Sequence, residues 1–276
     1  MTFTNGYLSY QIKKIWNIPF IVTVRDTDVN AFFKYMPHLR KTGIRILLEA
    51  EKIVFLSPKY RDLIIDKYTP DQFKQVLLEK SIVIPNGIDD YFLTNRFVNK
   101  IESAECLNII TVGLINKRKN HLAVCKAIES IYHKGKNIKY TIVGKIEDEK
   151  IFNKLRKYPF VEYKHHMTKE QLLLEYRKND IFIMPSITET FGLTYAEAMS
   201  QGLPVIYSKG QGFDGQFNEG LVGYHVTPSN SQDIVLAIKK IIENYQNISS
   251  RCTQLVKKFD WSKIANEYIK IYNNCV

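Results

Sequence analysis

Short apolar runs alternate with helix-patterned segments along the chain. The runs lie at 20–24, 52–56, 81–84, 107–112, 140–143, 160–163, 181–184, 205–207 and 222–226. Continuous apolar runs bounded by turn residues are typical of strands buried in a parallel sheet. The segments between them predict helices at 8–17, 31–50, from 57, at about 120–133, 170–178, 191–200, 232–243, 250–258 and from 261. This alternation predicts an α/β fold with parallel sheets.

The predicted strands fall into two unequal groups. Three of them precede the stretch 85–89, Pro-Asn-Gly-Ile-Asp, in which Asn-Gly is a strong turn signal. Residues 91–105 are predicted to link the two groups. A doubly wound domain usually carries about five or six strands, so the first group is short and the second is a full set. A sheet of only three strands is expected to expose an edge and apolar surface.

The stretch 179–205 combines a strand, a loop, a helix and the start of another strand. Pro185 and Ser186 end the strand, and the loop behind them carries Glu189. The backbone N–H groups from Thr190 to Leu193 are expected to lie at a helix N-terminus, which favours a phosphate group. Gly192 has no side chain to keep a ligand away from this backbone. The stretch therefore predicts an anion site with a carboxylate beside it.

A second carboxylate, Glu197, follows Glu189 by eight residues. At helical rise this spacing is about 12 Å along the axis, whereas the two carboxyls of a glycosidase lie about 5 to 9.5 Å apart. The pair suits an extended ligand with hydroxyls at both ends and phosphates between them, as in a nucleotide-diphosphate sugar. Taken alone, the two residues also fit a solvated helix position and part of an N-cap.

This stretch resembles the signature of retaining, nucleotide-sugar-dependent glycosyltransferases of family 4, also called group 1. The matching residues are Pro185-Ser186, Glu189, Phe191-Gly192, Glu197-Ala198, Gly202 and Pro204-Val205. The resemblance covers most of the chain and implies the GT-B fold, which has two Rossmann-like domains. It implies an acceptor-side domain at 1–95 that lacks its first part, a donor domain at 96–258, and a helix at 259–276 that crosses back to the first domain.

The same resemblance implies transfer of a sugar from a UDP- or GDP-sugar to a saccharide or lipid-linked acceptor with retention of configuration, and it implies no metal or other cofactor. Glu189 is then the catalytic residue that holds the sugar hydroxyls and places the anomeric carbon, and Glu197 bonds the ribose hydroxyls. The donor diphosphate is expected to face Thr190, Phe191, Gly192 and Leu193. The short first group of strands keeps an alternative open: a non-catalytic nucleotide-sugar-binding module, or half of a split enzyme.

Two further donor contacts are implied by the resemblance. Gly113 and Lys119 match the family pattern Gly-Arg-(x)4-Lys, in which the Lys grips the diphosphate, but Leu114 stands at the Arg position. The missing charge-assisted contact is worth about 1.5–3 kcal/mol, and Arg118 is the candidate to replace it. Gly144 stands where the family places a glycine beside the nucleotide. Without this context, 117–119 would be a solvated basic turn.

The segment after the first strand, Arg25-Asp26-Thr27-Asp28, has two interpretations. Asp-x-Asp can hold a divalent ion beside a diphosphate. The preceding strand, however, makes the segment similar to the family's His-Gly-x-Asp loop, which faces the cleft near the sugar. Arg25 replaces the usual His and Asp26 the usual Gly. Arg25 and Asp28 are therefore predicted on the acceptor side; an ion pair of Arg25 with a neighbouring aspartate is an equal alternative.

The formal Gly-x-Gly-x-x-Gly at 210–215 lacks the helix that a dinucleotide fingerprint needs. We therefore expect this loop to shape the sugar pocket. His165 and His166 have no further ligands at metal-site spacing and are predicted as loop residues.

The composition limits the classes of binding partner and the cellular location that are expected for this chain. The net charge is +11, but the basic residues are scattered and no nucleic-acid motif accompanies them, so nucleic acid is not expected. The four cysteines show no Cys-x-x-Cys spacing, the first residues lack a signal-peptide layout, and no apolar run approaches the ~18 residues of a membrane span. These features predict a cytoplasmic protein; a peripheral contact with the inner face of the membrane stays open. The sequence indicates no oligomeric state.

Overall fold

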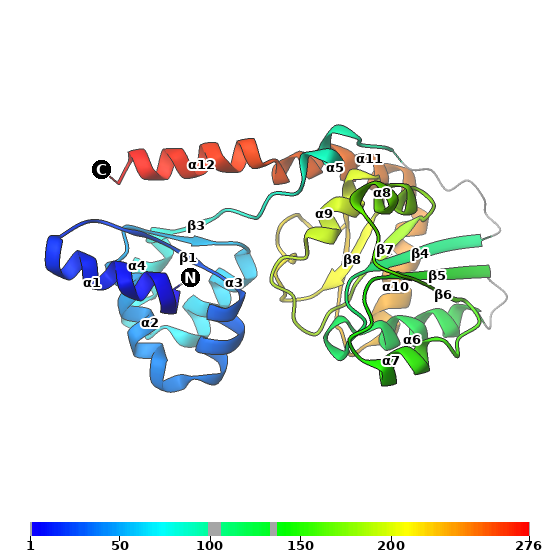
Figure 1. The fold of residues 1–276 in the computed structure, drawn as a ribbon, viewed down its shortest axis with the longest axis horizontal. Helices are drawn as coiled ribbons and strands as arrows, with labels where there is room; N and C mark the ends of the chain where they lie inside the picture. Colours follow the sequence, from blue (N-terminus) through cyan, green and yellow to red (C-terminus); the bar gives the residue numbers. More distant parts are fainter. Residues whose placement is uncertain (1, 99–105, 133–136, 276) are drawn as a thin grey trace.

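Two parallel sheets follow one another along the chain (Figure 1). The computed structural model describes residues 2–98, 106–132 and 137–275. The first sheet has the order β1-β2-β3, with β1 (Ile21–Val24), β2 (Lys52–Phe55) and β3 (Ser81–Val83). The second has the order β6-β5-β4-β7-β8-β9, with β4 (Cys106–Val112), β5 (Asn137–Val143), β6 (Val161–Lys164), β7 (Ile181–Ile183), β8 (Val205–Ser208) and β9 (Gly223–Val226). The predicted α/β fold is confirmed.

The first sheet is covered by short helical segments. They are a π-helical turn (Thr2–Gly6), α1 (Tyr7–Trp16), a second π-helical turn (Asp28–Phe33), α2 (Pro37–Glu49), α3 (Pro58–Leu63), a third turn (Ile64–Tyr68) and α4 (Asp71–Lys80). The single helix predicted at 31–50 was wrong, because Met36 has φ −118° and ψ 69° and breaks it. The cause is Pro37, which disfavours helical geometry at the residue before it and starts a new helix.

Helix α1 leaves apolar side chains on the surface. Leu8, Ile15 and Trp16 are all exposed, and no residue of this helix is buried. This agrees with the expectation that a three-stranded sheet leaves apolar surface uncovered. No helix in the part of the chain that the structure describes is both long enough and apolar enough to cross a bilayer.

The second sheet changes its direction of growth between β4 and β7. The chain runs outward from β4 to β5 and β6, and then returns to the other side of β4 with β7, β8 and β9. In open parallel sheets, ligands bind beyond the carboxyl ends of the strands at such a switch point. The flanking helices are α6 (His121–Tyr132), α7 (Glu149–Leu155), α8 (Lys169–Arg177), α9 (Leu193–Ser200), α10 (Ser231–Glu243) and α11 (Tyr245–Leu255), which continues as a 3-10 turn (Val256–Phe259).

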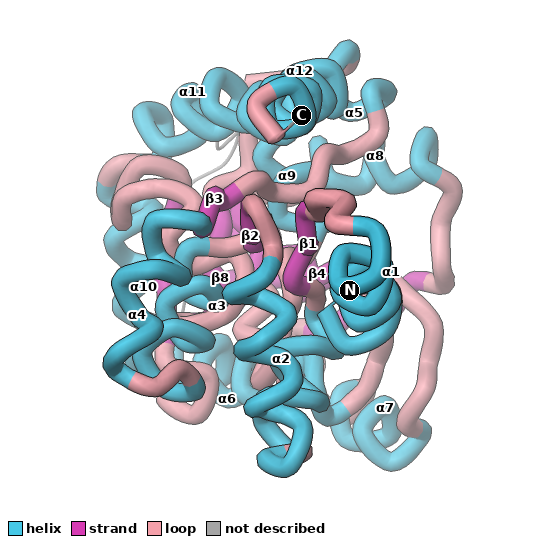
Figure 2. Tube along the Cα trace, turned by 90° about the vertical axis from the view of Figure 1, so that its left-hand side faces the viewer, coloured by secondary structure: helices cyan, strands magenta, loops and turns pink. Residues whose placement is uncertain are grey.

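The two sheets are joined by α5 (Asp90–Thr94) and by α12 (Trp261–Asn273), the last helix. Figure 2 shows α12 lying over the first sheet. Its buried Ile264 and Ile271 pack against Val54 and Ile84, and burial of such side chains stabilises by about 1.5–3 kcal/mol each. The predicted return of the final helix to the first domain is therefore confirmed.

Candidate active site

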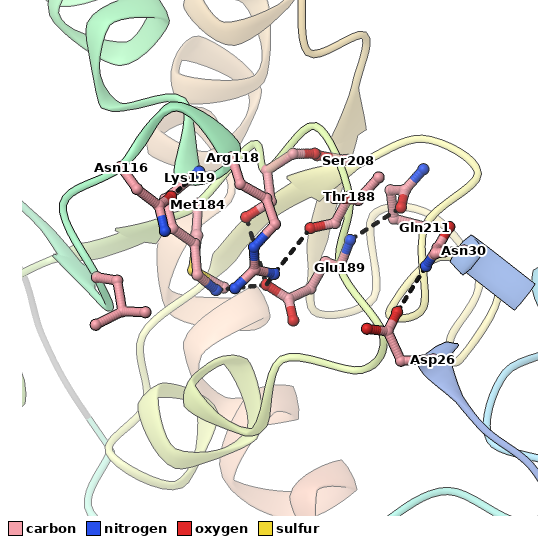
Figure 3. A network of polar contacts seen from close by, with 12 residues as sticks. Asp26, Asn30, Asn116, Arg118, Lys119, Met184, Thr188, Glu189, Ser208 and Gln211 are labelled. Carbon is pink, nitrogen blue, oxygen red and sulfur yellow. Dashed lines mark hydrogen bonds and ion pairs between the residues drawn. The ribbon is translucent and has the colours of Figure 1, made fainter. Parts of the chain in front are cut away.

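The turn after β4 and the loop after β7 meet at the switch point of the second sheet. Lys119 lies in the turn and Glu189 in the loop, and Lys119 Nζ is 2.5 Å from Glu189 Oε2 (Figure 3). Their side chains are only 10% and 9% exposed. A buried carboxylate needs such a partner, since an unpaired charge is costly away from water. The structure therefore brings together two residues that the sequence placed 70 positions apart.

Two asparagines hold the turn of Lys119 in place. The side-chain oxygen of Asn116 accepts a hydrogen bond from the Lys119 amide at 3.0 Å, as an N-cap residue does. Asn120 adopts a left-handed backbone with φ 60°, and its amide donates to the Pro185 and Pro228 carbonyls at 3.0 and 2.7 Å. Sequence reasoning missed both residues, although an Asn three residues before Lys119 is a recognisable capping signal.

Arg118 supplies a second cation at the site. Its Nη1 donates to the Thr188 carbonyl at 3.1 Å and lies 3.9 Å from Glu189 Oε2 (Figure 3). The side chain is 42% exposed, so one side of the guanidinium is open to solvent. Leu114, which stands at the family's Arg position, carries no charge. The predicted replacement of that Arg by Arg118 therefore fits this geometry and stays a prediction for donor binding.

The glycines near the strand ends are required by close packing. A Cβ on Gly144 would lie 2.0 Å from the Gly113 carbonyl oxygen, because β4 and β5 approach closely where they end. Gly192 has φ +72°, and a Cβ there would lie 2.5 Å from the Tyr195 ring and 3.3 Å from Glu189 Cγ. Gly144 and Gly192 therefore leave the backbone near Lys119 and Glu189 free of side chains.

Helix α9 begins beside this pair without a side-chain cap among the described residues. Its N-cap is Gly192 and its first residue is Leu193, two positions later than predicted. The Tyr195 N–H already donates to the Gly192 carbonyl at 3.0 Å, so the first-turn N–H groups of Leu193 and Thr194 are the candidates for an anion. Phe191 is buried, with its ring 5.3 Å from Phe259, so only its backbone could face a ligand. Thr190 lies in the same loop, directly after Glu189.

Glu197 lies on α9, four residues after Leu193, at the start of the second helical turn. The Tyr176 hydroxyl donates to its Oε2 at 3.2 Å. Burial raises the pKa of Glu197 to about 7, and the Tyr176 hydrogen bond opposes this rise. A carboxyl that titrates near neutral pH can accept ligand hydrogen bonds more strongly as it ionises.

The loop 210–215 holds the backbone of Glu189. It forms turns and no helix, as expected from the sequence. The Gly212 amide donates to the Glu189 carbonyl at 2.8 Å, and the Gln211 side-chain oxygen accepts from the Glu189 amide at 2.9 Å. The Gly-x-Gly-x-x-Gly pattern thus allows the loop 210–215 to pack closely against the loop that carries Glu189.

Replacing Gly212 by alanine is expected to destabilise the chain by about 1–3 kcal/mol, as overpacking does. The new Cβ would lie 1.6 Å from the Thr190 carbonyl oxygen, so the two loops must separate. Gly210→Ala is the control, since its Cβ would meet nothing within 4 Å and only its φ of +74° is unfavourable. Urea unfolding of both variants measures the difference. Equal losses of stability would contradict the close approach at Gly212.

On the acceptor side, the predicted contact of Asp28 with the acceptor stays a prediction. Asp28 is fully buried, and its carboxylate accepts hydrogen bonds from the Thr2, Phe3 and Arg25 amides at 2.9, 3.3 and 2.9 Å. Its oxygens tie the start of the chain to the end of β1, so backbone amides occupy the carboxylate that either an acceptor or a metal ion would need. Arg25 is exposed and, among the described residues, forms no ion pair with Asp26 or Asp28. Its acceptor contact stays a prediction.

The chain has two parallel α/β domains, and its final helix returns to the first of them. A buried charged pair lies at the switch point of the second sheet. This arrangement is that of a GT-B glycosyltransferase fold. The chain belongs to the family described as "Glycosyl transferases group 1", whose model matches residues 95–259. Both findings confirm the resemblance noted in the sequence.

Curated relatives and solved structures agree with this assignment. The chain is 23% identical over 296 residues to D-inositol 3-phosphate glycosyltransferase of Paenarthrobacter aurescens, covering 99% of this chain and 71% of the relative. It is 30% identical over 205 residues to the O-antigen biosynthesis glycosyltransferase WclY of Escherichia coli, covering 71% of this chain and 56% of that protein. In fold it is similar to Anabaena Alr3699/HepE in complex with UDP, with TM-score 0.77, 17% identity, and coverage of 98% and 76% of the two chains.

Proposed function

We propose that this chain transfers a sugar from a UDP- or GDP-sugar to a saccharide or lipid-linked acceptor, with retention of configuration at the anomeric carbon. The observation that carries the proposal is the buried Lys119–Glu189 pair beside the uncapped start of α9. Membership of the group 1 family supports it, as does a structural relative crystallised with UDP-glucose.

The proposed reaction breaks the bond between the anomeric carbon and the diphosphate oxygen, forms a new bond to the acceptor oxygen, and passes the proton of the acceptor hydroxyl to the leaving diphosphate. Charge develops on the leaving diphosphate, and Lys119, Arg118 and the first amides of α9 are placed to stabilise it. A lysine ammonium has three N–H donors, so Lys119 can bond Glu189 and a phosphate oxygen together. Glu189 then holds the sugar hydroxyls and fixes the anomeric carbon for attack.

Glu197 in this proposal accepts hydrogen bonds from the ribose hydroxyls, so its ionised form binds the nucleotide better. Its pKa of about 7 means that UDP affinity should rise about tenfold between pH 6 and pH 8, and that binding near pH 7 should release protons. Calorimetry in two buffers of different ionisation enthalpy measures this release. Because UDP itself also titrates, Glu197→Gln is the control, and an identical pH dependence in that variant would reject the ribose contact.

A donor screen tests the proposed function directly. A nucleotide sugar at a hundred times its dissociation constant should stabilise the chain by about 2.7 kcal/mol, which a thermal shift detects. Release of UDP or GDP from the stabilising donor is then measured with and without saccharide acceptors. Stabilisation with turnover supports the proposal, and stabilisation without turnover indicates a binding module. No stabilisation by any UDP- or GDP-sugar would overturn the proposal.

A further inference from the structure

The first domain contacts the backbone of Glu189 through one tyrosine. The hydroxyl of Tyr60, on α3, donates to the Glu189 carbonyl oxygen at 2.7 Å. Tyr60 is only 3% exposed, and 129 positions separate the two residues in sequence. The same oxygen accepts the Gly212 amide at 2.8 Å. The Glu189 carbonyl thus receives one donor from each domain.

The direction of the Tyr60 hydroxyl is set by Asn30. Asn30 Nδ2 lies 3.0 Å from the Tyr60 oxygen and 2.6 Å from Asp26 Oδ1. An amide NH₂ group only donates, so the phenol proton is left for an acceptor of the second domain: the Glu189 carbonyl oxygen at 2.7 Å is the nearer one, and Gln211 Oε1 lies at 3.4 Å. Burial raises the pKa of the Tyr60 hydroxyl well above its usual range, which keeps that proton in place. Figure 3 shows Asp26 and Asn30 beside Gln211, close to the Glu189 loop.

These contacts fix the main chain of Glu189 on every side. Its amide is held by Gln211, and its carbonyl by Gly212 and Tyr60. The Glu189 side chain is held separately, by Lys119. Without the Tyr60 hydroxyl, the main chain of Glu189 keeps its contacts within the second domain but loses its link to α3 of the first domain. Both domains are therefore needed to place this carboxylate fully.

We propose that Tyr60 is a positioning residue for the loop that carries Glu189. The Tyr60 hydroxyl, oriented by Asn30, fixes Glu189 when the first domain is in contact with the second. The inference rests on the proposed function for its effect on turnover. The hydrogen bonds that carry it are independent of any ligand. It adds a residue of the first domain to a site that the family signature places in the second.

The test is Tyr60→Phe in the full chain, which keeps the ring and removes the hydroxyl. Turnover of the donor should fall about tenfold, since a small misplacement of a reacting group can cost up to about a hundredfold. The donor KM and the UDP dissociation constant should stay within about twofold, because the diphosphate contacts lie in the second domain. Tyr68→Phe makes the same change in the same domain, at a ring that stacks on Phe33 away from Glu189. It should leave turnover unchanged.

A double-mutant cycle separates positioning from general loss of structure. Asn30→Ala should lower turnover in the parent chain but have no further effect in Tyr60→Phe, because residues in one network are not additive. Amide hydrogen exchange should also quicken at 187–193 in Tyr60→Phe and stay unchanged in Tyr68→Phe. This readout needs no enzymatic activity, so it tests the contact even if the proposed function fails. Parent-like turnover and exchange in Tyr60→Phe would overturn the inference, as would a loss of UDP affinity equal to the loss of turnover.

Discussion

Glu189→Gln is expected to lower donor turnover by about a hundred- to a thousandfold, which is the usual cost of losing one well-placed polar group in a transition state. The amide keeps the shape of the side chain and an oxygen that can accept from Lys119. It loses the negative charge that would hold the sugar hydroxyls. Stability should also fall, by up to about 3–5 kcal/mol, because the Lys119 ammonium stays buried without its carboxylate. Single-turnover kinetics and urea unfolding of the same preparation measure both effects.

A matched control exists in Glu175, which lies on α8 away from the switch point. Glu175 is 4% exposed, and Lys164 Nζ is 2.7 Å from its Oε1, so it too is a buried glutamate paired with a lysine. Glu175→Gln should therefore cost similar stability and leave turnover within about twofold. If Glu189→Gln also stays within twofold of the parent in turnover, the catalytic role of Glu189 is wrong.

Several strands were predictable because they are buried along most or all of their length, as β2, β7 and β8 are. A parallel strand such as β7 is then a continuous apolar run, which needs no long-range information to recognise. Helix α7 was missed because its short segment 149–155 has four polar residues and begins from a single capping residue, Asp148. The split at Pro37 was overlooked although the signal was local, since the apolar spacing on both sides of it is helical.

The site was predictable where each residue follows its own strand. Lys119 and Glu189 come after β4 and β7, and parallel topology alone brings such positions to one edge of a sheet. The partners of Asp28 could not be predicted, because its carboxylate bonds amides 26 and 25 positions away that have no distinctive side chains. Tyr60 was equally hidden, since its contact with Glu189 depends on how the two domains meet.

Lys119→Met is expected to weaken UDP binding by about ten- to a hundredfold. The lost contact with the diphosphate is charge-assisted and worth about 1.5–3 kcal/mol. The same change leaves the Glu189 carboxylate buried, with Ser186 Oγ at 3.4 Å and Arg118 at 3.9 Å as its remaining polar neighbours among the side-chain contacts described. Breaking one side of a buried pair costs about 3–5 kcal/mol. Calorimetry with UDP and urea unfolding measure the two losses separately.

The two losses have different causes, so a second substitution should separate them. In the double variant Lys119→Met/Glu189→Gln, neither charge of the buried pair remains. The free energy of unfolding should therefore recover most of what Lys119→Met alone lost. UDP affinity should not recover, because the cation that binds the diphosphate is still missing. Lys117→Met is the control, since that lysine is exposed in the same turn and should change neither quantity by much. Unchanged UDP affinity in Lys119→Met would show that this lysine serves only to balance Glu189, and the phosphate would then have to rest on Arg118 and the start of α9 alone.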